Sequence, residues 1–174
     1  MKDQSEQSQQ GYDARAVANL FLSWAREGKR RRQPFTPIEI IKLVYIAHGW
    51  CLAKLDKPLV FEQVEAWEYG PVIRSLYDAF KQFGRWPVEE DAEYEAYEGR
   101  SGPVQENIGG EYIEVLEEVY DKYSGYSGFE LANLTHDDPS SPWNRAREDG
   151  SRVISGDSIK DAYTSIVQGR RAQT

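Results

Sequence analysis

Cysteine and histidine are scarce in this sequence, and their scarcity limits the chemistry that the chain can perform. The 174 residues include one cysteine, Cys51, and two histidines, His48 and His136. A single cysteine cannot form an internal disulfide, and a zinc ion needs three or four ligands. Phosphate-binding loops, dinucleotide fingerprints and nucleophile elbows are also missing. We therefore expect no metal, no cofactor and a reducing, cytoplasmic environment.

Positive charge and long apolar segments are also in short supply. The chain carries 21 Lys and Arg against 29 Asp and Glu, which gives a net charge of -8. Phosphate backbones and anionic membranes are bound through Lys and Arg, so this balance disfavours both as the main ligand and favours a basic protein partner. We recognise no signal peptide and no apolar segment long enough to span a membrane.

The composition that remains is typical of a globular protein. Hydrophobic residues make up 40% of the chain and aromatic residues 13%, and the length suffices for one domain with a proper core. Residues 1–11 are rich in Gln and Ser and show no apolar periodicity. We expect a single compact domain over residues 12–168, preceded by a disordered tail at residues 1–11 and followed by a frayed end at residues 169–174.

The most apolar stretch predicts a central helix over residues 38–55. Thr36 and Glu39 are spaced as a capping box, and Pro37 stands at the first helical position, where its missing N–H costs nothing. Few residues interrupt the apolar content that follows. A helix that is hydrophobic nearly all round must be enclosed by other helices. The predicted fold is therefore mainly α, with shorter helices packed around this one.

Six further amphipathic segments predict the surrounding helices, at residues 13–27, 71–83, 111–123, 127–136, 142–150 and 155–167. Residues 59–68 alternate in part and predict a strand. A lone strand is not stable, so we expect residues 104–108 to pair with it in a small β-ribbon. Gly70 marks a boundary, after which Pro71 is expected to open the next helix.

Two arrangements could carry catalysis, and neither is complete. His48 and Cys51 lie three residues apart on the central helix, but a thiol in such an apolar helix is expected to be buried and inert. His136 ends a predicted helix, where it could satisfy free carbonyl groups. As a general base it would need a nucleophile that we cannot identify. We therefore predict that the protein is not an enzyme, and keep catalysis by His136 with a carboxylate as a lesser hypothesis.

Aromatic residues beside charges give candidate binding sites. Trp67 and Tyr69 bracket the turn at Gly70, where they could pack inward or serve as anchors for a partner. Six acidic residues fall within residues 89–98 and are interleaved with Tyr94 and Tyr97. This segment is either a solvated loop or a docking segment for a basic protein.

Four of these motifs together resemble a known family. They are the run from Lys42 to Trp50, the run from Glu65 to Val72, Leu134-Thr135-His136, and Pro142-Trp143. In this order they are similar to the SocA-like Panacea domain, whose members are antitoxins of bacterial and phage toxin–antitoxin pairs. The resemblance covers roughly residues 12–167.

The resemblance implies a protein that binds a cognate toxin and blocks it, with a role in phage defence. Relatives pair with many unrelated toxins, including alarmone-synthetase-like toxins that stop translation. At least one relative is an adaptor that delivers its toxin to a protease, so the alternative is a proteolytic adaptor or phage–host interaction protein that uses residues 1–10 as a tether. On either hypothesis the predicted partner-binding residues are Trp67, Glu68, Tyr69, Arg74, Tyr94, Tyr97, His136 and Trp143.

Overall fold

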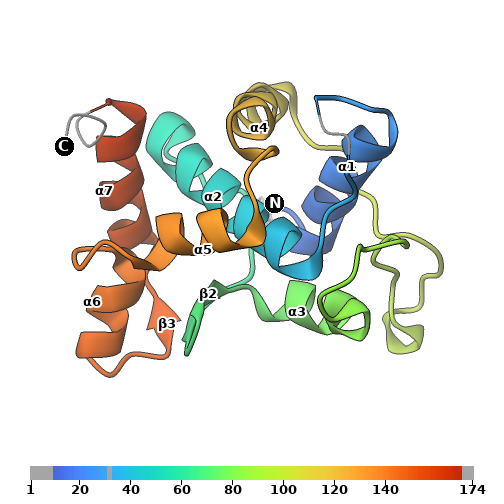
Figure 1. The fold of residues 1–174 in the computed structure, drawn as a ribbon. Helices are drawn as coiled ribbons and strands as arrows, with labels where there is room; N and C mark the ends of the chain where they lie inside the picture. Colours follow the sequence, from blue (N-terminus) through green and yellow to red (C-terminus); the bar gives the residue numbers. More distant parts are fainter. Residues whose placement is uncertain (1–9, 31–32, 170–174) are drawn as a thin grey trace, which may run out of the picture.

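The computed structural model describes residues 10–30 and 33–169 (Figure 1). Within these ranges the chain is mainly α-helical with a small antiparallel sheet, as predicted. The helices are α1 (Ala14–Arg26), α2 (Pro37–Leu55), α3 (Arg74–Phe80), α4 (Gly110–Tyr123), α5 (Gly128–His136), α6 (Pro142–Glu148) and α7 (Gly156–Val167). The strands are β1 (Val64–Trp67), β2 (Gly70–Val72) and β3 (Val153–Ile154), and the 3-10 helices are η1 (Lys81–Phe83) and η2 (Ala96–Glu98).

The predicted tail and frayed end fall almost entirely outside this description, because residues 1–9 and 170–174 are not among the described ones. The chain is anchored from Tyr12 onward. Its N–H donates to the Leu59 carbonyl at 2.8 Å, and its own carbonyl accepts from the Phe61 N–H at 3.1 Å.

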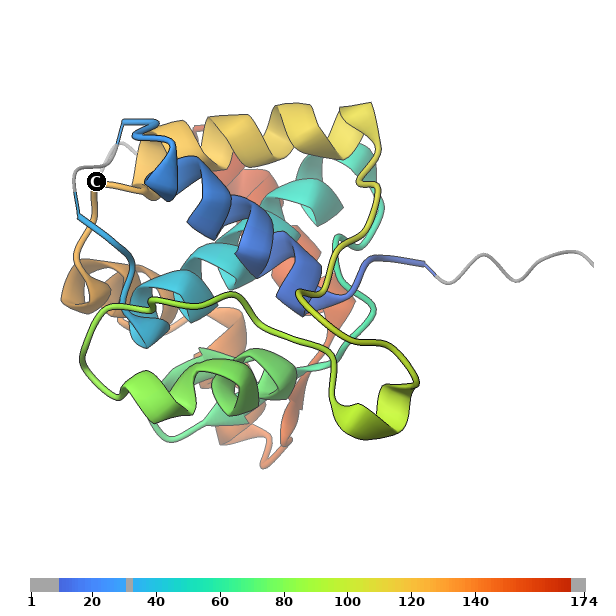
Figure 2. The same cartoon turned by 90° about the vertical axis from the view of Figure 1, so that its right-hand side faces the viewer.

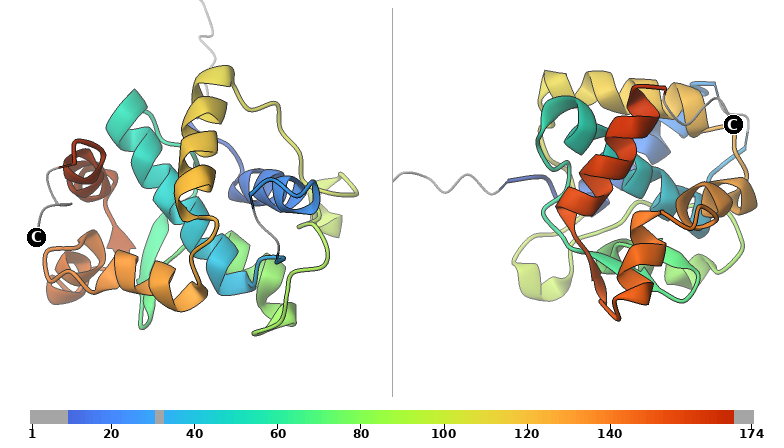
Figure 3. Two further views of the ribbon diagram at one scale, coloured as in Figure 1. Left: turned by 45° about the horizontal axis from the view of Figure 1, so that its top comes forward. Right: turned by 90° about the vertical axis from the view of Figure 1, so that its left-hand side faces the viewer.

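Helix α2 runs through the middle of the molecule, with α7 on one side and α4 and α1 on the other (Figure 3). Its start follows the sequence signal, since the Glu39 carboxylate accepts from the Thr36 N–H at 2.9 Å. Every residue from Ile40 to Leu52 is buried, which confirms the enclosed central helix. Its two ends reach solvent: Ile38 in the first turn is 44% exposed, and Lys54 in the last turn is also exposed.

A close approach between α2 and α7 occurs at Gly49. A Cβ atom built at this position would lie within 3 Å of three ring carbons of Tyr163 on α7. No side chain could therefore be added without moving the ring or the helix. The absence of a side chain at Gly49 allows α7 to pack directly on the backbone of α2.

The sheet contains a strand pairing that the sequence did not predict. Strand β1 pairs antiparallel with β2 through Glu65–Val72 and with β3 through Val64–Ile154. The prediction that residues 104–108 pair with β1 is wrong, because the Val104 N–H donates to the Ala92 carbonyl instead. A tight turn at Glu68 and Tyr69 lets β1 pair with the residues that follow it, so no distant partner is needed.

Pro71 does not open a helix, which corrects a second prediction. It lies in β2, at the edge of the sheet in the order β2-β1-β3, and α3 begins only at Arg74. Proline lacks a backbone N–H. An edge strand tolerates it because one side of the strand pairs with no neighbour, so an N–H on that side is not needed for a strand-to-strand hydrogen bond. Helix α3 is consequently shorter than the predicted helix at residues 71–83 and continues as η1.

The long segment between η1 and α4 passes beside α1 (Figure 2), and Asn19 of α1 holds it there. Its buried side chain donates to the carbonyls of Ala92 and Val104, at 2.9 and 3.0 Å, and accepts from the Ala92 N–H at 2.8 Å. One side chain thus fixes the backbone at Ala92 and at Val104, on either side of Tyr94 and Tyr97.

We expect Asn19→Ala to lower the free energy of unfolding by about 2–3 kcal/mol, because the buried Ala92 N–H and Val104 carbonyl lose their side-chain partner. Urea denaturation measures this loss. The matched control is Asn107→Ala at an exposed position, which should change stability by less than about 0.5 kcal/mol. Equal effects of the two substitutions would contradict this role of Asn19.

Candidate protein-binding surface

Four of the predicted binding residues meet beside the β1–β2 hairpin. The Trp143 indole N–H donates to the Trp67 carbonyl at 2.7 Å, and the His136 ring contacts Trp143 edge to face at a centroid distance of 5.5 Å. The Arg74 guanidinium lies 5.2 Å from the centre of the Trp67 ring and forms a 3.1 Å ion pair with Glu65. The end of α5, the starts of α6 and α3, and the hairpin therefore build one cluster.

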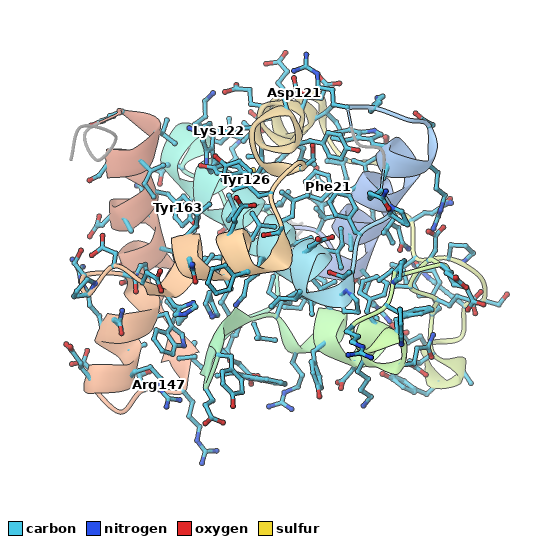
Figure 4. All side chains as sticks on the ribbon, in the orientation of Figure 1. Phe21, Asp121, Lys122, Tyr126, Arg147 and Tyr163 are labelled. Carbon is cyan, nitrogen blue, oxygen red and sulfur yellow. The ribbon has the colours of Figure 1, made fainter. Side chains whose placement is uncertain are left out.

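Two further contacts complete this group. The rings of Trp67 and Tyr77 lie 4.8 Å apart, and the Trp67 indole N–H donates to a Glu65 carboxylate oxygen at 2.6 Å. We call the set of Glu65, Trp67, Arg74, Tyr77, His136 and Trp143 the Trp67 cluster. Arg147, labelled in Figure 4, stacks over Trp143 at 5.7 Å. The cluster thus combines rigid aromatic rings with cations, the residue types that anchor protein interfaces.

Glu68 and Tyr69 form the tip of the hairpin next to this cluster. Both are exposed, and Tyr69 has 78% of its surface in contact with solvent. The interpretation that both aromatic residues of the motif pack inward is therefore wrong for Tyr69. A two-residue turn points its side chains away from the sheet, so only Trp67, which lies within β1, can pack against neighbours.

The other predicted residues, Tyr94 and Tyr97, lie at a separate cavity of about 630 Å³. It is bounded by the start of α1, by α3 and by residues 90–97, and its lining includes seven carboxylates. We call this cavity the acidic cleft. Its carboxylates belong to Asp13, Glu62, Asp78, Glu90, Asp91, Glu93 and Glu95.

Of the described residues that line the acidic cleft, only Arg15 and Arg74 are cationic. Arg15 is the more buried of the two and is already paired. Arg15 forms ion pairs with Asp13 at 2.7 Å and with Glu98 at 2.8 Å. The hydrogen bond from Arg15 lowers the pKa of Glu98 to about 2, and the two carboxylates raise the pKa of Arg15. The cleft therefore presents an excess of negative charge, which suits a cationic segment of a partner.

Arg74 is part of both the Trp67 cluster and the acidic cleft, because it stacks on Trp67 and also lines the cleft. The structure thus brings Trp67, Arg74, His136 and Trp143 into contact, leaves Glu68 and Tyr69 at the exposed tip, and places Tyr94 and Tyr97 across the cleft. The two groups lie along the same lower edge of the molecule in Figure 1.

His136 does not have the role that its position predicted. Its own carbonyl accepts from the Asn144 side-chain amide at 2.8 Å, so Asn144 and not the imidazole satisfies a free carbonyl at the end of α5. The Nε2 atom lies 3.5 Å from Asp137, whereas the buried Nδ1 atom has no hydrogen-bond partner among the described residues.

Lys42 is a buried residue that sequence reasoning passed over. It lies on α2 with 2% of its surface exposed, and its ammonium donates to the Pro71 carbonyl at 2.9 Å. Burial lowers the pKa of Lys42 to about 8. A Cβ atom added to Gly70 would lie 2.5 Å from the ammonium nitrogen and 3.8 Å from His136 Nδ1, so the hairpin passes directly over this cation. The only available signal was one lysine within an otherwise apolar run.

The two remaining candidates for catalysis are part of the core. His48 Nδ1 accepts from the Leu59 N–H at 3.2 Å, and burial lowers the pKa of His48 to about 4. Cys51 is fully buried, and burial raises the pKa of its thiol to about 12, which confirms the expectation of a buried, inert thiol. Among residues 10–30 and 33–169, no group of three His, Cys, Asp or Glu side chains could hold a metal ion.

A comparison with protein families matches residues 40–144 to the family described as "Antitoxin SocA-like, Panacea domain". This range covers more than half of the chain and contains the whole Trp67 cluster. The chain therefore belongs to the SocA-like Panacea family, as its motifs predicted. No helix in the described part of the chain is long and apolar enough to cross a membrane.

Among curated proteins, the chain is similar to Antitoxin SocA of Caulobacter vibrioides (strain NA1000 / CB15N), with 41% identity over 78 residues. The matched segment covers 45% of this chain and 40% of the relative, so it spans less than half of that protein's length. No solved structure matches the chain significantly.

The lowered pKa of Lys42 predicts a dependence of stability on pH. Between about pH 8 and 10.5 the folded lysine has lost its proton while the unfolded one retains it, so raising the pH favours folding. The free energy of unfolding should rise by about 2 kcal/mol from pH 7 to 9.5 in the wild type relative to Lys42→Met. Urea denaturation across this range, with Lys54→Met at the exposed end of α2 as control, measures the difference. Parallel pH curves for wild type and Lys42→Met would contradict the prediction.

Proposed function

We propose that this protein is a non-enzymatic antitoxin that neutralises a cognate protein toxin by direct binding through the Trp67 cluster, the hairpin tip and the acidic cleft. The observation that carries the proposal is the family match over residues 40–144, because all eight predicted binding residues fall within it. The fold supports this choice of surface, since it joins the two groups of residues through Arg74.

The chemistry of the surface suits a protein partner. Tyr69 stands free at the tip, and Trp67 and Trp143 are held rigidly behind it by hydrogen bonds. Rigid aromatic anchors lose little conformational entropy on binding, and Trp, Tyr and Arg are the most frequent hot spots of interfaces. A stable complex should bury about 1,200–2,000 Å² in total, which is more than the hairpin tip offers and requires the neighbouring cleft.

Charge favours a basic toxin. The net charge of -8 and the carboxylates of the acidic cleft would accelerate encounter with a cationic surface. Proteins that handle nucleotides or RNA carry such surfaces, since phosphates are bound by Lys and Arg. We propose an enzyme of this kind, such as an alarmone-synthetase-like toxin that stops translation in the cytoplasm, as the target, with the antitoxin covering its substrate site.

The test of this function is to co-express the chain with the product of the neighbouring gene. We expect that product to arrest growth alone, growth to recover when the chain is present, and the two proteins to purify together. Toxicity that persists beside this protein, with no complex recovered, would contradict the proposal.

Within such a complex we expect Tyr69→Ala to weaken toxin binding by at least about tenfold, because an exposed aromatic anchor is lost. The free energy of unfolding of Tyr69→Ala should stay within about 0.5 kcal/mol of the wild-type value, because the Tyr69 side chain is mostly exposed. Calorimetric titration measures the affinity. Phe129→Ala, an equally exposed aromatic on α5 outside this surface, is the matched control and should bind normally. Unchanged affinity of Tyr69→Ala would exclude the hairpin tip from the interface.

A further inference from the structure

A second cavity, of about 650 Å³, lies over α2 between the end of α4, α5, the start of α6 and α7. We call it the α5–α7 groove. None of its lining residues belongs to the Trp67 cluster or the acidic cleft. In Figure 4 the labelled Lys122, Tyr126 and Tyr163 lie around this region. Its volume is within the range of about 300–1,000 Å³ that binding sites occupy.

The groove is mainly apolar, and part of its wall is open to solvent. Leu134 on α5 is 51% exposed and Tyr126 is 37% exposed, while Ile46 and Ile166 contribute aliphatic surface from α2 and α7. Exposed apolar side chains gathered in one cavity usually mark a binding site.

Three polar side chains that line the groove, those of Tyr45, Tyr163 and Thr135, are already paired within the protein. The Tyr45 and Tyr163 rings lie edge to face at 5.9 Å, and their hydroxyl groups hydrogen-bond to each other. Thr135 donates its hydroxyl hydrogen to the Ala132 carbonyl at 2.9 Å. A small polar ligand needs convergent polar groups that fix its orientation, and these pairings occupy them. The floor is better matched to an apolar side chain.

The rim of the groove is acidic. Among the described residues that line it, Glu130, Asp137 and Asp138 are acidic and Lys122 alone is cationic. The Lys122 ammonium is directed over the Trp50 and Tyr123 rings, at 5.5 Å from each centroid. A partner that enters the groove therefore meets apolar side chains at the centre and carboxylates at the edge.

We propose that the α5–α7 groove binds a peptide segment of a basic protein, with a bulky apolar side chain against Leu134 and Tyr126 and Lys or Arg beside the rim carboxylates. The assignment of this segment to the toxin rests on the proposed function. The toxin would then contact the antitoxin at two places, and the linkage of two weak contacts raises the overall affinity.

A random twelve-residue peptide library displayed on phage, selected against the full chain, tests the groove without knowledge of the toxin. We expect enriched peptides to combine bulky apolar residues with Lys or Arg. Leu134→Lys should weaken their binding at least tenfold, because it removes the apolar wall and adds a positive charge that repels the Lys or Arg of the peptide. Phe129→Lys, an exposed apolar residue of the same helix that does not line the groove, should leave the affinity within twofold.

Asp137→Lys is the second variant, because it reverses one rim charge and leaves the apolar wall intact. A cation at the end of a helix is favourable, so this variant should fold even where Leu134→Lys does not. We expect it to weaken peptide binding several-fold at low salt, with the effect diminishing as salt is added. Failure to enrich peptides, enrichment of peptides without cations, or equal binding to the wild type and both groove variants would overturn the proposal.

The complex with the neighbouring gene product separates the two proposals. If that product binds the wild type and Leu134→Lys equally well, the groove does not take the toxin and this inference fails, while the antitoxin function stands. If the product does not bind the wild type and the selected peptides still require Leu134, the groove stands and the proposed function fails.

Discussion

The burial of α2 on every side is the constraint on which the remaining structure depends. Helices of seven to fourteen residues, such as those around it, are marginal in isolation and gain their stability from packing. All of them are placed by contact with α2 or with an element that contacts it. Because no face of this helix from Ile40 to Leu52 reaches solvent, contact with a partner is left to the surrounding helices and the turns between them.

The few polar residues inside α2 position those turns. His48 Nδ1 accepts hydrogen bonds from the N–H groups of Leu59 and Val60, which fixes the segment leading into β1. Lys42 bonds to the Pro71 carbonyl and lies under Gly70, which supports the hairpin that presents Tyr69. Burying an ammonium group is costly, as the lowered pKa of Lys42 shows. The same residue keeps the β1–β2 hairpin attached to the core.

The sequence predicted the features that depend on local signals. The capping box predicted at Thr36 and Glu39 placed the start of α2 correctly, because a cap requires only residues within one turn, and the helices predicted over residues 13–27 and 127–136 begin at Ala14 and Gly128. The partner of β1 was predicted wrongly, since strand pairing depends on contacts that local patterns do not encode. For the candidate site, the prediction named Trp67, Arg74, His136 and Trp143 of the Trp67 cluster, but neither Glu65 and Tyr77 nor the fact that Arg74 joins the cluster to the acidic cleft. The α5–α7 groove escaped prediction because its lining is drawn from distant parts of the chain. Tyr45, Leu134 and Pro142 belong to the family motifs, but local patterns do not show that these motifs meet in one cavity.

The contact at Gly49 has a consequence for where this family's folding unit ends. The family match stops at residue 144, yet the ring of Tyr163, nineteen positions later, lies flat against the Gly49 backbone and covers one side of α2. A chain shortened to the matched range would expose that side to water and would lose the wall of the α5–α7 groove that Ala162, Tyr163 and Ile166 form on α7. A chain without α7 would need another element to shield α2, and a different element at that place would change the shape of the α5–α7 groove.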